Sequence, residues 1–303
     1  MELSINLFRL AEKYGALRAS HMGKVAGFSA CDYSLALIDK SDSPLYGENY
    51  VSVAEGIRKD IENGGLKITQ THAPFGFSQN QWDTPHLFTD TVLPTLVKSI
   101  EITAIMGAPI VVVHPIHHME YRGHEEEIFK KNMGFYRTLI PYAKEYGVKI
   151  AVENMWQKDK LRNMNSFDTC GTSSEFIRYV DTLDSEHIVA CLDVGHVELP
   201  DGSETVQDII YALGHDRLKA LHIHDNDYKG DQHLLPYFGK LNWAEITKAL
   251  GEIDYNGDFT YEVNNYMFIN VCDALAQDAV NYMGTVGKEL VRQVEANRRK
   301  ICI

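Results

Sequence analysis

The sequence predicts a single (β/α)8 barrel, the TIM barrel fold, over residues 1–303. Short apolar or β-branched runs alternate eight times with longer amphipathic stretches, which is typical of repeated βα units around a parallel sheet. No Pro/Gly/Ser-rich linker or low-complexity tract divides the chain. Apolar residues make up 45% of the sequence and charged residues 23%, as in ordinary globular proteins. We therefore expect one domain of the α/β class.

The expected strands are the runs of four to eight apolar residues that turn residues bound. They are residues 3–8, 30–35, 67–71, 109–114, 148–153, 188–193, 218–224 and 258–262. The clearest helical segments carry an apolar face at helical spacing and several open with a capping residue. They are residues 89–106, 125–146, 173–183, 243–250 and a closing helix at 273–299.

Five of the expected strands end at a side chain that can bind a metal. These residues are His114, Glu153, Asp193, the pair His222 and His224, and Glu262. Alternate residues of a barrel strand point inward, and the active sites of such barrels lie at the carboxyl ends of the strands. A single Asp or Glu at a strand end is commonly a turn former or a helix N-cap. Five at one register, with no Lys or Arg ending a late strand, favour a shared cation because buried carboxylates need a counter-charge.

Further candidates lie in the loops at the same end of the barrel. His72 follows the third strand and could be a ligand, a substrate contact or a loop histidine, whereas His196 lies three residues after Asp193. Asp231 and His233 belong to the loop after the seventh strand. Spacing alone does not choose between His222 and His224, since both have the inward parity. We expect the histidines of the loop after His114 to be surface groups, namely His117, His118 and His124.

The net charge disfavours some classes of partner, and the cysteine content indicates the cellular compartment. The net charge of −13 and the pI of 5.4 disfavour nucleic acid and membrane surfaces as partners. Five dispersed cysteines without a C-x-x-C pair indicate free thiols in a reducing compartment. The sequence shows no signal peptide and no apolar run of about 18 residues, so we expect a cytoplasmic protein.

Three motifs resemble the xylose isomerase-like superfamily of barrels over nearly the whole chain. They are A-V-E-N around Glu153, L-D-V-G-H around Asp193 and His196, and H-I-H-D-N-D followed by D-Q-H-L-L-P-Y-F-G-K-L-N-W. That superfamily includes sugar-phosphate isomerases and epimerases, inosose-converting enzymes and endonuclease IV. The resemblance implies a metal set of Glu153, Asp193, His222 and Glu262, because relatives carry the metal histidine as the first letter of H-x-x-D-N. It implies one divalent cation, Mn²⁺, Co²⁺, Mg²⁺ or Zn²⁺, which suits oxygen-rich ligands with one imidazole.

The resemblance implies an isomerase or epimerase of a sugar, sugar phosphate or cyclitol. In this interpretation Glu153 and Glu262, expected on opposite sides of the barrel, act as acid and base through an enediolate, and His196 steadies a substrate oxygen. Additional metal or substrate contacts are expected among His72, His114, His224, Asp231, His233 and Asp159. The chain departs from ketohexose 3-epimerases, since Asp159 replaces a glutamate and Tyr228 replaces an arginine, so the substrate does not carry over. Relatives often form dimers or tetramers, which makes a homo-oligomer an open expectation.

Two alternatives to the isomerase remain open. The resemblance to endonuclease IV implies a trinuclear zinc site, for which this chain holds all the ligand types. They are His72, His114, Glu153, Asp193, His196, His222, Asp231, His233 and Glu262. The acidic charge, the lack of basic residues on the loops that would face DNA, and the continuation D-V-G-H-V-E-L argue against this alternative. The second alternative is a non-catalytic sugar-binding barrel with a structural metal.

Overall fold

Eight parallel strands form one sheet that wraps into a barrel. The computed structural model describes residues 1–200, 202, 204–263 and 271–298. The strand order is β10-β1-β2-β3-β4-β5-β8-β9, and all neighbouring pairs are parallel. Ile223 bridges Tyr261 between the two outer strands, so the barrel is nearly closed. The strands are β1 (Leu3–Asn6), β2 (Ala30–Ser34), β3 (Lys67–His72), β4 (Ile110–Val113), β5 (Lys149–Glu153), β8 (Ile188–Asp193), β9 (Leu218–His222) and β10 (Phe259–Tyr261).

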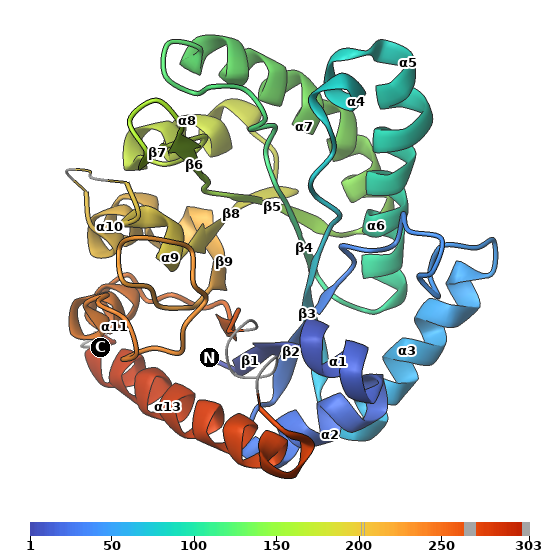
Figure 1. The fold of residues 1–303 in the computed structure, drawn as a ribbon, viewed down its shortest axis with the longest axis vertical. Helices are drawn as coiled ribbons and strands as arrows, with labels where there is room; N and C mark the ends of the chain where they lie inside the picture. The colour runs from blue at the N-terminus through green and yellow to red at the C-terminus, as the bar shows by residue number, and fades with distance from the viewer. Residues whose placement is uncertain (201, 203, 264–270, 299–303) are drawn as a thin grey trace, which may run out of the picture.

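Helices surround the barrel, as the view down its axis shows (Figure 1). The predicted fold class is thereby confirmed. The longer helices are α1 (Phe8–Tyr14), α2 (Ala16–Ala26), α3 (Tyr50–Gly64), α6 (Leu93–Ile105), α7 (Glu125–Tyr146), α8 (Ser173–Leu183), α10 (Val206–Arg217), α11 (Trp243–Glu252) and α13 (Ala276–Asn297). Short helical segments are α4 (Gln79–Asp83), α5 (Pro85–Leu87), the π-helix η1 (Phe88–Val92), α9 (Val194–Val197) and the 3-10 helix η2 (Asp273–Leu275).

The inside of the barrel holds a small apolar layer of its own. Val112, Ala151, Cys191 and Ala220 pack together there with Val189, separately from the large core between strands and helices. Each of the first four stands two residues before a candidate ligand, because side chains alternate along a strand. Because these four residues face the inside of the barrel, the residues two positions further along also face inward, as expected. They are His114, Glu153, Asp193 and His222.

Other strands fill the barrel with polar side chains. Ser4, Asn6, Asp32, Gln70 and Thr260 are all buried. Asp32 accepts a hydrogen bond of 2.7 Å from the Gln70 amide. Polar groups at this depth need partners of their own kind. This half of the interior therefore lies against the polar centre described below rather than against the apolar layer.

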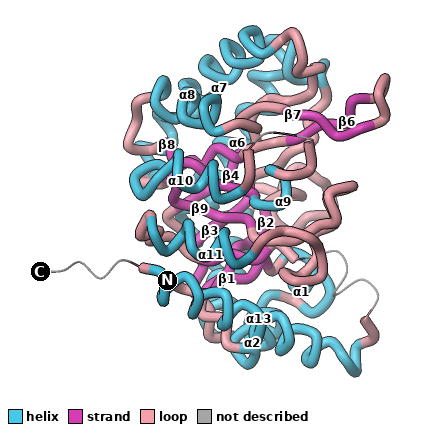
Figure 2. The backbone as a smooth tube through the Cα atoms, turned by 90° about the vertical axis from the view of Figure 1, so that its left-hand side faces the viewer, coloured by secondary structure: helices cyan, strands magenta, loops and turns pink. Residues whose placement is uncertain are grey.

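The structure differs from the expected elements in several places. Two strands end earlier than expected, β1 at Asn6 and β9 at His222. An antiparallel hairpin, β6 (Trp156–Asp159) and β7 (Met164–Phe167), stands out from the end of the barrel (Figure 2). Its polar strands lack the periodic apolar pattern that predicts a sheet. The expected helix at 89–106 begins as the π-helix η1, where Pro94 has no N–H to give to the carbonyl four residues earlier. The closing helix ends at Asn297, and its expected end at residue 299 lies outside the described residues.

Among the described residues, no helix is both long and apolar enough to cross a membrane. The four described cysteines are free, as expected. Cys31, Cys170 and Cys191 are buried and Cys272 is exposed, whereas Cys302 lies outside the described residues.

Candidate metal centre

Four side chains at the carboxyl ends of the strands converge on one point. Glu153, Asp193, His222 and Glu262 each offer one ligand atom, and these atoms all lie within 4.8 Å of one another. His222 Nδ1 lies 2.9 Å from Glu153 Oε1, 3.5 Å from Glu262 Oε2 and 3.9 Å from Asp193 Oδ2. The first three side chains are buried, and that of Glu262 is 17% exposed. Residues more than 100 positions apart in the chain thus surround one small volume.

The second oxygen of Glu153 faces two further histidines. Glu153 Oε2 lies 3.0 Å from His114 Nε2 and 3.5 Å from His72 Nε2, and the two Nε2 atoms are 3.1 Å apart. His72 Nδ1 donates a hydrogen bond to the carbonyl of Ala73, so Nε2 of the neutral ring carries the lone pair. Two imidazole nitrogens this close need a shared proton or a cation between them. His72, His114 and Glu153 form a second candidate ligand group.

Asp231 lies between two histidines in the same manner. His196 Nδ1 donates to the carbonyl of Asn154 and His233 Nδ1 donates to that of Glu262, each at 2.8 Å. Their Nε2 atoms lie 3.3 and 3.2 Å from the same oxygen, Asp231 Oδ2. In the neutral rings both nitrogens present lone pairs to a carboxylate. This arrangement suits either protonated imidazoles or a bound cation.

His224 joins these groups. Its Nε2 lies 2.9 Å from Asp193 Oδ1, and its ring stacks on His233 with centroids 4.0 Å apart. The ring packs directly on Gly195, where an added Cβ would lie 1.9 Å from His224 Cε1. Glycine is therefore required at the third position of D-V-G-H. His224 completes two more candidate groups, one with Asp193 and His196 and one with His233 and Glu262.

The pKa values of these groups follow from burial and from each other. Burial alone disfavours the charged forms, and it lowers the pKa of His114 to about 4. For Glu153 the adjacent His222 and His114 outweigh burial and hold the pKa well below its usual range. For His233 burial is outweighed by Asp231 and Glu262, which raise the pKa to about 10. A carboxylate-rich pocket of this kind, with imidazoles facing inward, fits a divalent cation.

Three residues that were not among the expected site residues, Asn154, Gln70 and Asp32, support the candidate ligands. Asn154 accepts from the backbone N–H of Asp193, donates to its carbonyl, and offers its own carbonyl to His196. Beneath His222, Gln70 Nε2 lies 3.0 Å from His222 Nε2 while also donating to Asp32. For Asp32 and Gln70 the sequence offered one signal of this role, which is a polar side chain at an inward-facing position of the second and third strands.

Asp225 explains the long motif after the seventh strand. Its carboxylate accepts hydrogen bonds from the indole of Trp243 at 2.8 Å and from the N–H groups of Tyr237 and Leu241. A Cβ on Gly239 would lie 2.2 Å from Asp225 Oδ1. The motif thus folds the loop that carries Asp231 and His233.

Other expected residues lie elsewhere. Asp159 is outside every candidate ligand group; it accepts from the N–H groups of Leu161 and Arg162 and pairs with the Arg162 guanidinium at 2.6 Å. The expectation that His118 is a surface group was wrong, since its side chain is only 11% exposed under the aromatic residues of the β3–α4 loop. Glu153 and Glu262 stand three strand positions apart around the eight-stranded barrel, one position short of opposite, because β8 and β9 separate β5 from β10.

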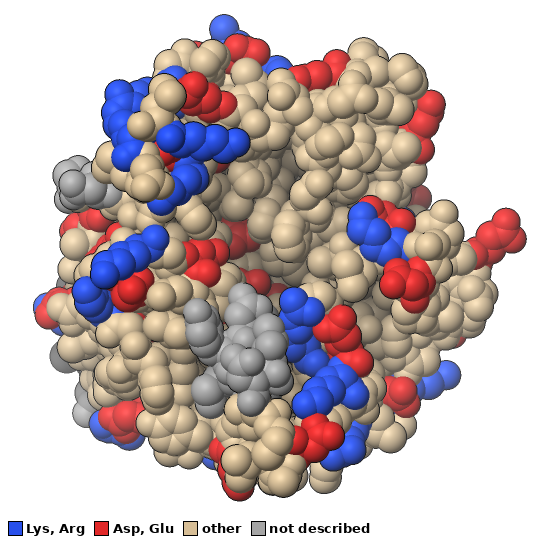
Figure 3. Space-filling model, in the orientation of Figure 1, with Lys and Arg blue, Asp and Glu red and all other residues tan. Residues whose placement is uncertain are grey.

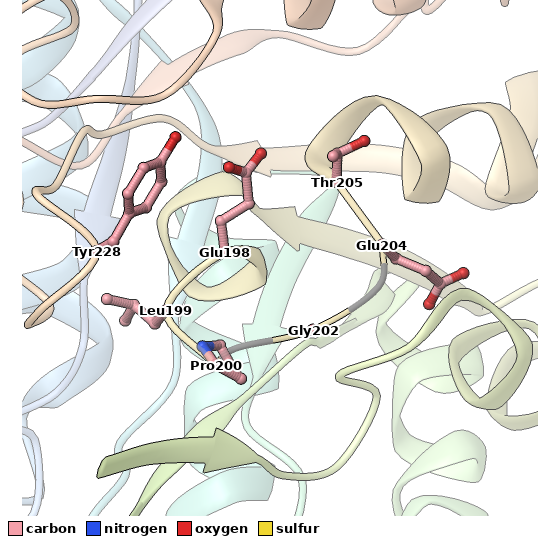
Figure 4. A pocket seen from close by; sticks show the side chains of 7 residues that line it. All are labelled: Glu198, Leu199, Pro200, Gly202, Glu204, Thr205 and Tyr228. Carbon is pink, nitrogen blue, oxygen red and sulfur yellow. The ribbon is translucent and has the colours of Figure 1, made fainter.

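The face shown in Figure 3 has a central hollow with acidic side chains beside its opening. A separate cavity of about 340 Å³ lies between the α9–α10 and β9–α11 loops (Figure 4). None of the candidate ligands lines it. Its carboxylates serve the backbone, since Glu204 accepts from the N–H of Ser173 and Glu198 from that of Val206.

Known proteins resemble this chain at the level of family and fold. A solved structure described as a D-tagatose 3-epimerase-like protein superposes with a TM-score of 0.71 at 22% identity, covering 98% of this chain and 99% of that one. At this identity the likeness shows the fold alone. In sequence, an "uncharacterized protein y4fM" of Sinorhizobium fredii is 32% identical over 170 residues, 55% of this chain and 51% of the relative. A "probable endonuclease 4" of Bacillus velezensis is 27% identical over 204 residues, 63% of this chain and 64% of the relative.

The chain thus spans between about half and two thirds of the length of these curated relatives. The model of the family described as "Xylose isomerase-like TIM barrel" matches residues 24–283. That match includes all the candidate ligands and all strands except β1. The chain belongs to the xylose isomerase-like TIM barrel family.

Proposed function

We propose that this protein is a divalent-metal-dependent isomerase or epimerase of a polyhydroxylated carbonyl compound, a sugar, sugar phosphate or cyclitol. The observation that carries the proposal is the convergence of Glu153, Asp193, His222 and Glu262 within 4.8 Å. The epimerase-like structural neighbour supports the same class. The acidic net charge of −13 suits a small neutral or metal-bound substrate better than a polyanion.

Glu153, Asp193, His222 and Glu262 would hold the cation. A divalent cation at such a site supplies Lewis-acid polarisation of a carbonyl and makes the adjacent C–H more acidic. Glu262 is the more exposed of the two glutamates, so we assign it the first proton transfer. Glu153, whose low pKa keeps it ionised, is the second acid–base group. His196, whose Nε2 lies 3.8 Å from Asp193 Oδ2, would position a substrate oxygen.

Proton exchange with solvent tests this proposal. The purified protein loaded with Mn²⁺ is incubated in D₂O with a panel of ketoses, inososes and their phosphates, and deuterium is followed by NMR. We expect deuterium at a carbon beside the carbonyl of at least one substrate. Glu262→Gln should slow its incorporation by about 10²-fold to 10⁴-fold, the usual contribution of a positioned acid or base.

The matched control is Glu55→Gln, an exposed glutamate on α3 far from the centre, which should leave the rate unchanged. Full metal retention without exchange on any member of the panel contradicts the proposal. That result instead supports the alternative of a sugar-binding barrel with a structural metal.

A second candidate function is phosphodiester hydrolysis with several zinc ions. It is favoured by the two additional groups, His72 with His114 on Glu153 and His196 with His233 on Asp231, which can hold further cations. The family relative named endonuclease 4 agrees with it. Elemental analysis separates the two candidates. One metal per chain supports the isomerase, whereas three zinc ions per chain together with incision of abasic-site DNA support the nuclease.

A further inference from the structure

A second cavity, of about 350 Å³, lies between the β4–α7 loop and the β6–β7 hairpin. Its lining includes three cationic side chains, Arg122, Lys158 and Lys160. None of these three forms an ion pair with another described residue of the chain. Figure 3 shows Lys and Arg side chains gathered beside the central hollow, in the region that the hairpin occupies in Figure 1.

Two carboxylates also line this cavity, but they do not neutralise it. Asp159 is already paired with Arg162 and with the backbone of the hairpin turn. Glu120 therefore stands against three free cations. A net positive cavity in a chain of net charge −13 indicates selection of an anionic ligand.

Polar atoms of His118 and Asp168 beside the cavity lack the partners that buried polar groups need. Both ring nitrogens of His118 are buried without a hydrogen bond, and the nearest carboxylate oxygen, Asp83 Oδ2, is 3.6 Å away. His117 Nδ1 lies 3.5 Å from Asp168 Oδ2, a buried oxygen that has no hydrogen-bond partner. The unpartnered ring nitrogens of His118 beside free cations are expected where a ligand with several acceptor oxygens binds.

Shared wall residues and a ring contact link the cavity to a candidate ligand of the metal centre. His117 and His118 also line a smaller aromatic cavity of about 130 Å³, whose wall includes His114. The rings of His114 and His117 are in contact, with centroids 5.9 Å apart. A ligand held by the hairpin cations can therefore extend past His117 towards Glu153 and Glu262.

We propose that the cavity formed by Arg122, Lys158, Lys160, His117 and His118 binds the phosphate group of a phosphorylated substrate whose carbonyl end reaches the metal centre. Lysine and arginine supply the charge, and the histidines supply directed N–H donors. This inference rests on the proposed function and names its substrate class. Arg162 and Lys229 are not part of this subsite, because Arg162 is paired with Asp159 and Lys229 does not line the cavity.

Phosphorus NMR on the Mn²⁺-loaded full chain tests the subsite without requiring turnover. The probes are inorganic phosphate, fructose 6-phosphate and fructose, and the dissociation constant of each is measured in competition. Fructose 6-phosphate should bind more tightly than either inorganic phosphate or fructose. The Lys158→Gln/Lys160→Gln variant should weaken its binding by about tenfold, since each exposed ion pair contributes up to about 1 kcal/mol.

Lys229→Gln, an exposed lysine on the β9–α11 loop, is the matched control and should bind as the wild type does. Arg122→Gln is the second variant, in case the double variant alters the hairpin. Paramagnetic relaxation by Mn²⁺ should place the phosphorus beyond direct contact with the metal. The proposal is overturned if all variants bind fructose 6-phosphate equally, if inorganic phosphate binds as tightly, or if the phosphorus relaxes as a direct metal ligand. A failure of deuterium exchange leaves this binding measurement unaffected, so the two proposals fail separately.

Discussion

Three histidines at the mouth of the barrel are oriented by the backbone. His72, His196 and His233 each donate Nδ1–H to a main-chain carbonyl at 2.8 Å, which turns the opposite nitrogen towards a carboxylate. Second partners of this kind fix ring orientation and tautomer in metal sites. The centre is thus arranged for ligation by the fold itself, before any ligand is added.

The sequence predicted the positions of these candidate ligands better than it predicted the residues that support them. Glu153 and Asp193 end apolar strands, so their parity and their position follow from alternation alone. His196 lies on the short helix α9 and His233 on a loop, and spacing could not show that both face Asp231. Asp32 and Gln70 lie within strands that pack on polar rather than apolar neighbours, and only the three-dimensional arrangement of the barrel interior reveals why.

Glu175, at the start of α8, provides a prediction at the scale of one residue. Burial raises its pKa from 4.5 to about 7, although a hydrogen bond from Tyr121 opposes the shift. Because the folded protein holds this proton more tightly than the unfolded chain, the stabilisation is complete below pH 4.5 and is lost as the pH rises to about 7. Glu175→Gln cannot ionise and should raise the free energy of unfolding at pH 8 by about 1–3 kcal/mol.

Urea denaturation of the variant and the wild type at pH 5 and pH 8 measures this effect. The gain at pH 5 should be smaller than at pH 8. An equal change at both pH values means that Glu175 is ionised in the folded protein and that the assignment is wrong. Glu55→Gln again serves as the exposed control.

Among the elements, the short helix α9 does most to shape the centre. Asp193 caps it by accepting from the N–H of His196, and its one glycine lets the His224 ring lie against the backbone. The sequence showed D-V-G-H as a motif, but a four-residue helix has too few positions to show a periodicity. By contrast, α7 and α8 were predicted with their observed ends because their apolar faces are long.

Gly195→Ala should therefore disrupt the centre. The added Cβ would meet the His224 ring, which is fixed by Asp193 and by stacking on His233. We expect a loss of about 1–3 kcal/mol in the free energy of unfolding together with weaker Mn²⁺ binding. Calorimetric titration and denaturation measure both quantities.

Gly134→Ala in α7 is the matched control. A Cβ there meets no atom within 4 Å, and alanine is the better helix former by about 0.5–1 kcal/mol. This variant should be stabilised with unchanged metal affinity. If Gly195→Ala behaves in the same way, the packing of His224 on this turn does not matter for the centre.

At the scale of the whole molecule, the candidate ligands join distant parts of the chain. They come from β3, β5, β8 and β9, from the helix α9, and from the loops after β4, β9 and β10. The sequence predicted this closure from the count of βα units, yet the separation of Glu153 from Glu262 by only two strands depends on how β9 meets β10. A cation held by ligands from so many strands should stabilise the barrel as a unit.

Metal removal should therefore lower the melting temperature. A cation at about 100 times its dissociation constant adds about 2.7 kcal/mol to the stability of the native state, which corresponds to a shift of about 5 °C in a chain of this size. Calorimetry with Mn²⁺ and after EDTA treatment measures the shift. Identical melting temperatures contradict a cation site that unites the strands, and Glu262→Gln should reduce the difference between the two conditions.

Anomalous diffraction at the manganese edge from crystals of the Mn²⁺-loaded protein tests the central claim most directly. We predict a peak at about 2.0–2.6 Å from ligand atoms of Glu153, Asp193, His222 and Glu262, the range of divalent metal–ligand bonds. The absence of a peak among these four side chains, or a peak confined to another part of the molecule, contradicts the account.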